Sequence, residues 1–141
     1  MEFLEPYFDY VFHAGFIALW LIICLALAKI SGWSQLAKIY PCKEKFSGSK
    51  SYFSTICING ANYINVVTIG VNQTHFYLKL MFIFSFGSKP LLIPYTAIKG
   101  KISKWGPSNS VDLNINNIIL NLSIKQADRM VKASKGTWHY Q

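Results

Sequence analysis

Histidines and cysteines, the side chains that most often bind metals or act as nucleophiles, are few in this chain. They are His13, His75, His139, Cys24, Cys42 and Cys57. No two of them stand at the short spacing that a metal-binding motif needs, so we expect no metal and no cofactor. Cys57 and His75 would form a nucleophile pair only if folding brought them together, and a strand cysteine with a turn histidine is the simpler interpretation.

The acidic residues also give no indication of catalysis. After the first apolar run they are Glu44, Asp112 and Asp128, which are far apart along the chain. This spacing does not suggest a carboxylate pair for general acid–base chemistry. The nine glycines are dispersed and form no phosphate-binding loop. The sequence therefore predicts that the protein is not an enzyme.

An uncharged apolar run, residues 11–28, lies near the N-terminus. As a helix it is about 27 Å long, close to the thickness of a bilayer's hydrocarbon core. The segment before it is acidic, whereas a cleaved signal peptide begins with basic residues. We therefore expect a transmembrane helix over residues 11–30. His13 lies within it and is a candidate for a contact with another helix, although a histidine near the membrane surface can also simply reach headgroup water.

The charges are distributed unevenly about this run. All 14 lysines and arginines follow it, whereas Glu2, Glu5 and Asp9 precede it. Basic residues flanking a span are retained on the cytoplasmic side. The sequence thus predicts a single-pass protein of the bacterial inner (plasma) membrane, with residues 1–10 as an acidic extracytoplasmic tail and the remainder of the chain in the cytoplasm.

Residues 31–50 form a basic zone between the apolar run and the rest of the chain. A short amphipathic helix is expected here, ended by Pro41. The candidate membrane-interface residues are Trp33, Lys38, Tyr40, Lys43, Lys45 and Lys50. Their lysines would attract anionic lipid headgroups. The alternative is a plain linker whose lysines only determine the topology.

From residue 51 the apolar pattern has a period of two, which predicts a β-rich domain over residues 51–141. The predicted strands are 52–58, 63–71, 75–86, 91–95, 98–105, 111–115 and 118–122. Asn59-Gly60 and Asn116-Asn117 are typical of hairpin turns. Ser123, with Gln126 three residues later, predicts the start of a final helix that ends near residue 134.

The most regular of these strands is 75–86. One of its faces carries only apolar side chains: Phe76, Leu78, Leu80, Phe82, Phe84 and Phe86. We expect this face to point into the core, with Leu80 at its centre. The segment 91–95 runs extended with Pro90 and Pro94 at its ends, which favours an edge strand or a crossing segment over a central strand. The expected fold is membrane-anchored and mainly β: one transmembrane helix, then an antiparallel barrel or curled sheet with a C-terminal helix.

This order of strands and one helix resembles the pleckstrin-homology (PH) and GRAM-like superfold over residues 45–135. Two short segments, 32–41 and 90–98, are similar to parts of small uncharacterised bacterial single-span membrane proteins. They contain Gly32-Trp33, Leu36-Ala37, Tyr40-Pro41 and Pro90-Leu91-Leu92-Ile93-Pro94-Tyr95. The resemblance implies docking of lipid or protein and not catalysis. The turn at 59–62 has no lysine or arginine, so inositol-phosphate binding is not implied.

Together these features predict a non-enzymatic accessory or scaffold subunit of a larger membrane protein complex. It would dock through its transmembrane helix and its basic cytoplasmic domain. The alternative is a free-standing, PH-like module that binds lipid or another ligand at the membrane surface. Nucleic acid is a weaker candidate partner, because a basic domain tethered to a membrane already faces an anionic surface.

Overall fold

The computed structural model describes residues 5–103 and 110–141. Two N-terminal helices, α1 (Glu5–Ser31) and α2 (Trp33–Ile39), precede the strands. The strands and the last helix are β1 (Ser49–Ile58), β2 (Ala61–Val71), β3 (His75–Leu80), β4 (Leu91–Pro94), β5 (Lys99–Ser103), β6 (Ser110–Ile115), β7 (Ile118–Ser123) and α3 (Ile124–Ala133). Residues 1–4 of the predicted tail and 104–105 of the predicted fifth strand lie outside the described residues.

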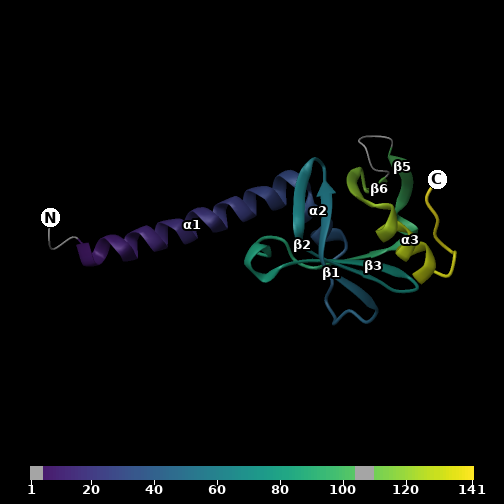
Figure 1. Ribbon diagram of the computed structural model, residues 1–141, viewed down its shortest axis with the longest axis horizontal. Helices are drawn as coiled ribbons and strands as arrows, with labels where there is room; N and C mark the ends of the chain where they lie inside the picture. The colour runs from purple at the N-terminus through teal and green to yellow at the C-terminus, as the bar shows by residue number, and fades with distance from the viewer. Residues whose placement is uncertain (1–4, 104–109) are drawn as a thin grey trace.

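Helix α1 has 27 residues, and it projects from the strands as one straight rod (Figure 1). Over residues 7–31 it is long and apolar enough to cross a membrane, and its most apolar 18-residue window has a mean hydropathy of 2.4. Only 11% of its most apolar window is buried inside the protein. The prediction of a long apolar N-terminal helix is confirmed. Residues 5–10, which we assigned to the tail, continue the helix.

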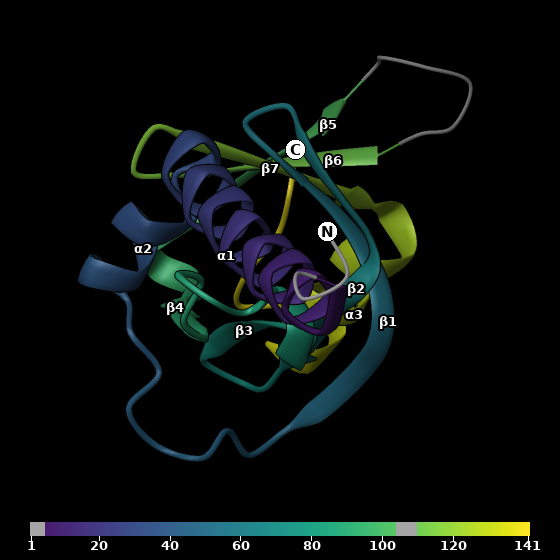
Figure 2. The same cartoon turned by 90° about the vertical axis from the view of Figure 1, so that its left-hand side faces the viewer.

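The seven strands form one curled antiparallel sheet in the order β4-β3-β2-β1-β7-β6-β5. Viewed along α1, the strands are arranged in a ring behind the helix (Figure 2). The two predicted hairpin turns are confirmed. Asn59 and Gly60 have φ values of 47° and 86°, and Asn116 and Asn117 have 53° and 68°, as a two-residue turn between twisted strands requires. This architecture is consistent with a PH-like fold.

Both edges of the sheet are covered by other parts of the chain. At β4, the backbone N–H of Leu92 donates to the carbonyl of Tyr40, and that of Cys42 donates to the carbonyl of Pro90. At β5, the N–H of Ile102 donates to the carbonyl of Gln141. These bonds satisfy edge groups that could otherwise pair with another chain. The prediction of an edge strand between two prolines is confirmed.

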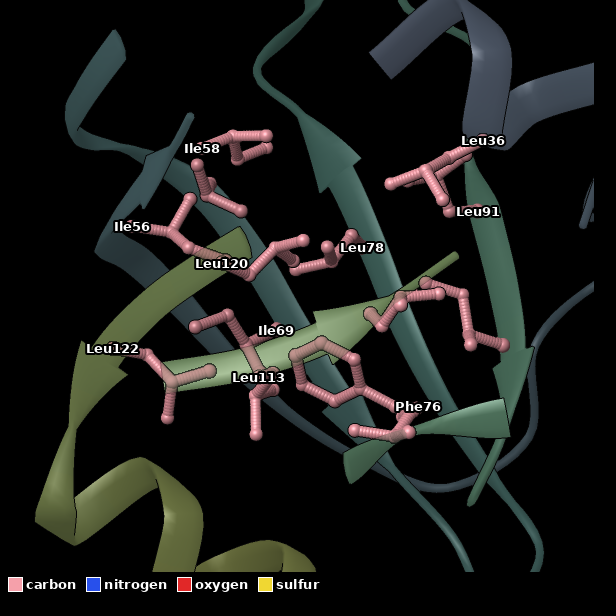
Figure 3. Packing of buried hydrophobic residues seen from close by; sticks show 14 of the residues in the cluster. Leu36, Ile56, Ile58, Ile69, Phe76, Leu78, Leu91, Leu113, Leu120 and Leu122 are labelled. Atoms are coloured by element: carbon pink, nitrogen blue, oxygen red, sulfur yellow. The ribbon is translucent and has the colours of Figure 1, made fainter. Parts of the chain in front are cut away.

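The inner face of the sheet is filled by apolar side chains that α2 and α3 cover. Those drawn in Figure 3 come from α2 and from strands in both halves of the sheet. Ala127 and Met130 of α3 are fully buried against them. As predicted, Ser123 caps α3: its hydroxyl oxygen accepts from the backbone N–H of Gln126 at 3.3 Å. The Gln126 side chain instead donates to the hydroxyls of Ser51 and Ser54.

The predicted strand 75–86 is wrong beyond residue 80. Its first half is as expected, with Phe76, Leu78 and Leu80 buried. Pairing with β2 ends at Leu80, and a 3-10 turn (Phe82–Phe84) follows. After Leu80 the chain contacts α1 instead of continuing along β2. The alternating phenylalanines therefore do not share one inward face.

The side chains of Phe76 and Phe82 provide a matched test of this boundary. Phe76 is fully buried and Phe82 is 88% exposed. Phe76→Ala should lower the free energy of unfolding by about 3–5 kcal/mol because it leaves a cavity in the core. Phe82→Ala should change it by less than about 0.5 kcal/mol. Denaturant unfolding of both variants in the same detergent measures the difference, and equal losses would contradict the boundary at Leu80.

Candidate membrane-facing surface

The surface of α1 is apolar along almost its whole length, and the domain covers only the C-terminal part of the helix. Tyr10 near one end is 77% exposed, and Ile30 near the other is 73% exposed. Contiguous apolar surface of this extent is not stable in water and marks contact with a membrane or another protein. Only the C-terminal part of α1 is packed into the domain, where Cys24, Ala28 and Ser31 are buried.

A sharp junction at Gly32 joins α1 to α2. Gly32 has φ +88°, a left-handed conformation that glycine adopts without strain. A Cβ atom here would lie 2.8 Å from Cδ1 of Ile118, so the backbone also packs directly on the sheet. The next residue, Trp33, is already the first residue of α2. The junction therefore has neither the length nor the freedom of a flexible linker.

Polar contacts inside the domain hold the same junction. The indole N–H of Trp33 donates to the carbonyl of Lys89 at 2.7 Å. The hydroxyls of Ser31 and Tyr63 are 3.1 Å apart and share a hydrogen bond. Burial raises the pKa of the Tyr63 phenol, although its bond to Ser31 opposes the shift, so this phenol stays neutral and in place at physiological pH. These bonds connect α1 and α2 to the strand domain.

The prediction that Trp33 lies at the membrane interface is wrong. Its side chain is fully buried and packs on the ring of Tyr63, with centroids 5.7 Å apart. Leu36, on the apolar face of the same helix, is also fully buried. The amphipathic pattern of α2 therefore reflects packing on the sheet. An apolar helical face has the same spacing whether it meets lipid or a protein core, so the sequence could not distinguish them.

The other predicted interface residues lie nearer the surface. Lys38, Lys43 and Lys45 are exposed, and Tyr40 is half-buried beside β4. Lys50 is also half-buried, with its ammonium group 5.7 Å from the centre of the Tyr77 ring. The segment between α2 and β1 loops out beside the sheet and does not run along α1 (Figures 1 and 2). The structure thus does not gather these residues into one patch with Trp33.

A loop that the sequence did not single out lies against α1. It consists of residues 81–88, which we call the apolar loop. The indole N–H of Trp20 donates to the carbonyl of Ile83 at 2.8 Å, and its ring packs on Phe84 with centroids 5.1 Å apart. A signal was present, because this run is uncharged and stands between Lys79 and Lys89. However, the alternating phenylalanines of this run predicted a strand, so the loop was not recognised from the sequence.

His13 is exposed on α1 and makes a local hydrogen bond. Its Nδ1 lies 2.6 Å from the carbonyl oxygen of Asp9, one turn earlier. Since a carbonyl can only accept, Nδ1 carries the proton in this bond, and Nε2 is left free to make a second hydrogen bond. A contact of His13 with another helix remains a prediction, and Nε2 is the atom that would make it.

The residues considered for catalysis are not brought together. Cys57 pairs with the beginning of β2, whereas His75 follows the end of β2. The Nδ1 atom of His75 instead lies 2.7 Å from the hydroxyl of Thr74. Within residues 5–103 and 110–141, no group of three or more His, Cys, Asp or Glu could hold a metal ion. The three cysteines are free.

Comparisons with protein-family models, with curated proteins and with solved structures gave no match for this chain. The suggested relationship to PH/GRAM-like bacterial membrane proteins therefore stays a prediction. The features that bear on function are the geometry of α1, its junction with the domain and the apolar loop.

Two glycine substitutions test the close packing at the junction. Gly60 also has a positive φ, +86°, but nothing lies within 4 Å of a Cβ placed there. Gly60→Ala should lower the free energy of unfolding by about 1–2 kcal/mol through backbone strain alone. Gly32→Ala should lower it by about 1 kcal/mol more, because the terminal methyl group of Ile118 must shift to admit the new side chain. Thermal unfolding followed by circular dichroism compares them, and equal destabilisation would argue against the tight junction.

Proposed function

We propose that this protein is a single-span, non-enzymatic accessory or scaffold subunit of a membrane protein complex. Helix α1 crosses the bacterial inner membrane with the N-terminus outside, and the strand domain lies in the cytoplasm. The large exposed apolar surface of α1 supports membrane insertion, and the distribution of lysines and arginines supports the orientation. The protein's role is to hold its domain at a defined place beside its partners.

The observation that carries this proposal is the fixed junction between α1 and the domain. An enzyme or sensor tethered only for localisation needs no defined angle to the membrane, and a flexible linker would serve it. Here Gly32 packs on Ile118, and Trp33 is buried and hydrogen-bonded. Such a junction fixes which face of the domain is presented to a neighbour. That is the property a scaffold requires.

The partner's contacts would be of two kinds. In the bilayer, the exposed side of α1 offers the Nε2 atom of His13 for a hydrogen bond in an otherwise apolar surface. Outside the bilayer, the domain offers a basic surface to which acidic groups of a partner can dock, because 13 of the 14 basic residues follow α1. Anionic lipid headgroups would meet the lysines nearest the membrane.

A second candidate function is a lipid- or ligand-binding module. A groove of about 430 Å³ beside Arg129 and Lys132 has the charge to hold an anion. This groove involves α3, which lies at the end of the domain away from α1 (Figure 1). Headgroups of the membrane that holds α1 would therefore not reach it. The interior of the curled sheet is filled by buried side chains such as Phe76 and Ile93, which also disfavours a ligand there.

The orientation is tested with reporters fused after Gln141. A green fluorescent protein fusion should be fluorescent, and an alkaline phosphatase fusion should be inactive, because the positive-inside rule keeps the domain in the cytoplasm. The measurement is the ratio of the two signals at equal expression in bacteria. An active phosphatase with a dark fluorescent fusion would reverse the proposed topology.

The partner contact is tested by His13→Leu, with Phe12→Leu as the matched control. Both residues are exposed on α1. Losing one interhelical hydrogen bond should weaken association by about 0.6–2 kcal/mol, whereas exchanging one apolar side chain for another should have little effect. The measurement is the amount of partner recovered with each variant after mild detergent extraction, at equal expression. Equal recovery with both would remove the case for a contact through His13.

A further inference from the structure

We infer that the apolar loop, residues 81–88, inserts into the lipid bilayer beside α1 and is a second membrane element of this protein. This inference rests on the proposed function, in that α1 must span the membrane. The medium around the inserted loop is the acyl-chain region of the leaflet that faces the domain. Four observations support it: the depth of the loop along α1, its exposed side chains, its partly bonded backbone and the charges that flank it.

The depth of the loop follows from its contacts. A hydrocarbon core of about 30 Å holds about 20 helical residues. Because α1 has 27 residues, every stretch of this length within it includes residues 12–24. Trp20 therefore lies in the core for any placement of the helix. Since Trp20 hydrogen-bonds the carbonyl of Ile83 and packs on Phe84, these two residues lie at the same depth.

The loop runs along α1 with its tip directed away from the domain. Near its end, a Cβ on Gly87 would lie 2.7 Å from Cδ2 of Leu25, so Gly87 approaches α1 closely. Nearer its tip, Ile83 and Phe84 contact Trp20, which is five residues earlier in α1. This separation is about 7.5 Å along the helix axis. Figure 1 shows the segment between β3 and β4 extending from the sheet toward α1.

The side chains of the loop are exposed where lipid would surround them. Phe82 is 88% exposed, Ile83 56% and Phe86 47%. A cluster of large apolar side chains at the tip of a loop is not stable in water and marks an interaction site. The cluster is continuous with the exposed apolar surface of α1 through the contact at Trp20. One occupant, the lipid around α1, therefore covers both.

The backbone of the loop is partly bonded within the protein, which lowers the cost of placing non-helical chain in a bilayer. The carbonyls of Met81, Phe82 and Ser85 accept from N–H groups within the loop. The carbonyl of Ile83 accepts from Trp20, and the carbonyl of Gly87 accepts from the hydroxyl of Ser34 at 3.3 Å.

The charges around the loop fit the same placement. No residue from Met81 to Ser88 is charged, whereas Lys79 precedes the loop and Lys89 follows it. Both lysine side chains are exposed. Long basic side chains at the ends of a membrane-inserted segment extend to the headgroups, where anionic lipid attracts them.

The experiment uses nitroxide labels on the full chain in vesicles of phosphatidylethanolamine and phosphatidylglycerol. The native cysteines are replaced, and single cysteines are introduced as Phe82→Cys, Phe16→Cys or Gln73→Cys. Phe16 is exposed on α1 and reports the span itself. Gln73 is exposed in the turn before β3, at the opposite end of that strand from the loop, and is the matched aqueous control. Collision rates with oxygen and with a water-soluble nickel chelate are measured for each.

The expected result is a high oxygen-to-nickel ratio at residues 82 and 16 and a low ratio at 73. A low ratio at 82 with a high ratio at 16 would overturn the inserted loop while leaving the anchor intact. Low ratios at both 82 and 16 would overturn the anchor and the inference with it. Protection of residue 82 from both reagents would show that protein, such as a second copy of the chain, covers the loop, which also contradicts the inference.

Discussion

The burial of Trp33 directly after the left-handed turn at Gly32 is the interaction on which the rest of the structure depends. Through this burial, the C-terminal end of the long apolar helix α1 becomes part of the domain core. Ile118 packs on Gly32, and the carbonyl of Lys89 accepts from the indole of Trp33. Because Lys89 directly follows the apolar loop, the same contact also sets where that loop meets α1. One local arrangement thereby determines the positions of the helix, the loop and the sheet relative to each other.

This arrangement explains why the molecule has two kinds of apolar surface. The inner face of the sheet is covered by α2 and α3 and forms an ordinary core. The surface of α1 and the tip of the apolar loop are both uncovered, and they are joined through Trp20. Uncovered apolar area of this size needs a surrounding apolar medium or partner. In the proposed membrane arrangement, lipid covers most of it, and a partner's helix contacts part of the rest.

Much of the fold could be predicted from the sequence, because each element has a local signal. The long uncharged run, the two Asn-containing turns, the prolines around β4 and the Ser123 cap are local patterns, and the structure bears them out. What could not be predicted depends on contacts between distant residues. The strand pattern at 82–86 gave no indication that Trp20, more than sixty residues earlier, would hold this segment. Trp33 looked like an interfacial residue because its burial depends on Tyr63 and Lys89, which come later in the chain.

The central claim is that the domain is held at a fixed angle to a membrane-spanning α1. It is tested most directly by the distance between nitroxide labels at residues 16 and 73 in lipid nanodiscs, measured by double electron–electron resonance. Residue 16 lies within α1, and residue 73 lies between β2 and β3. A fixed angle predicts one narrow distance distribution, because the junction at Gly32 and Trp33 allows no hinge. A broad distribution, as a flexible tether would give, would contradict the claim.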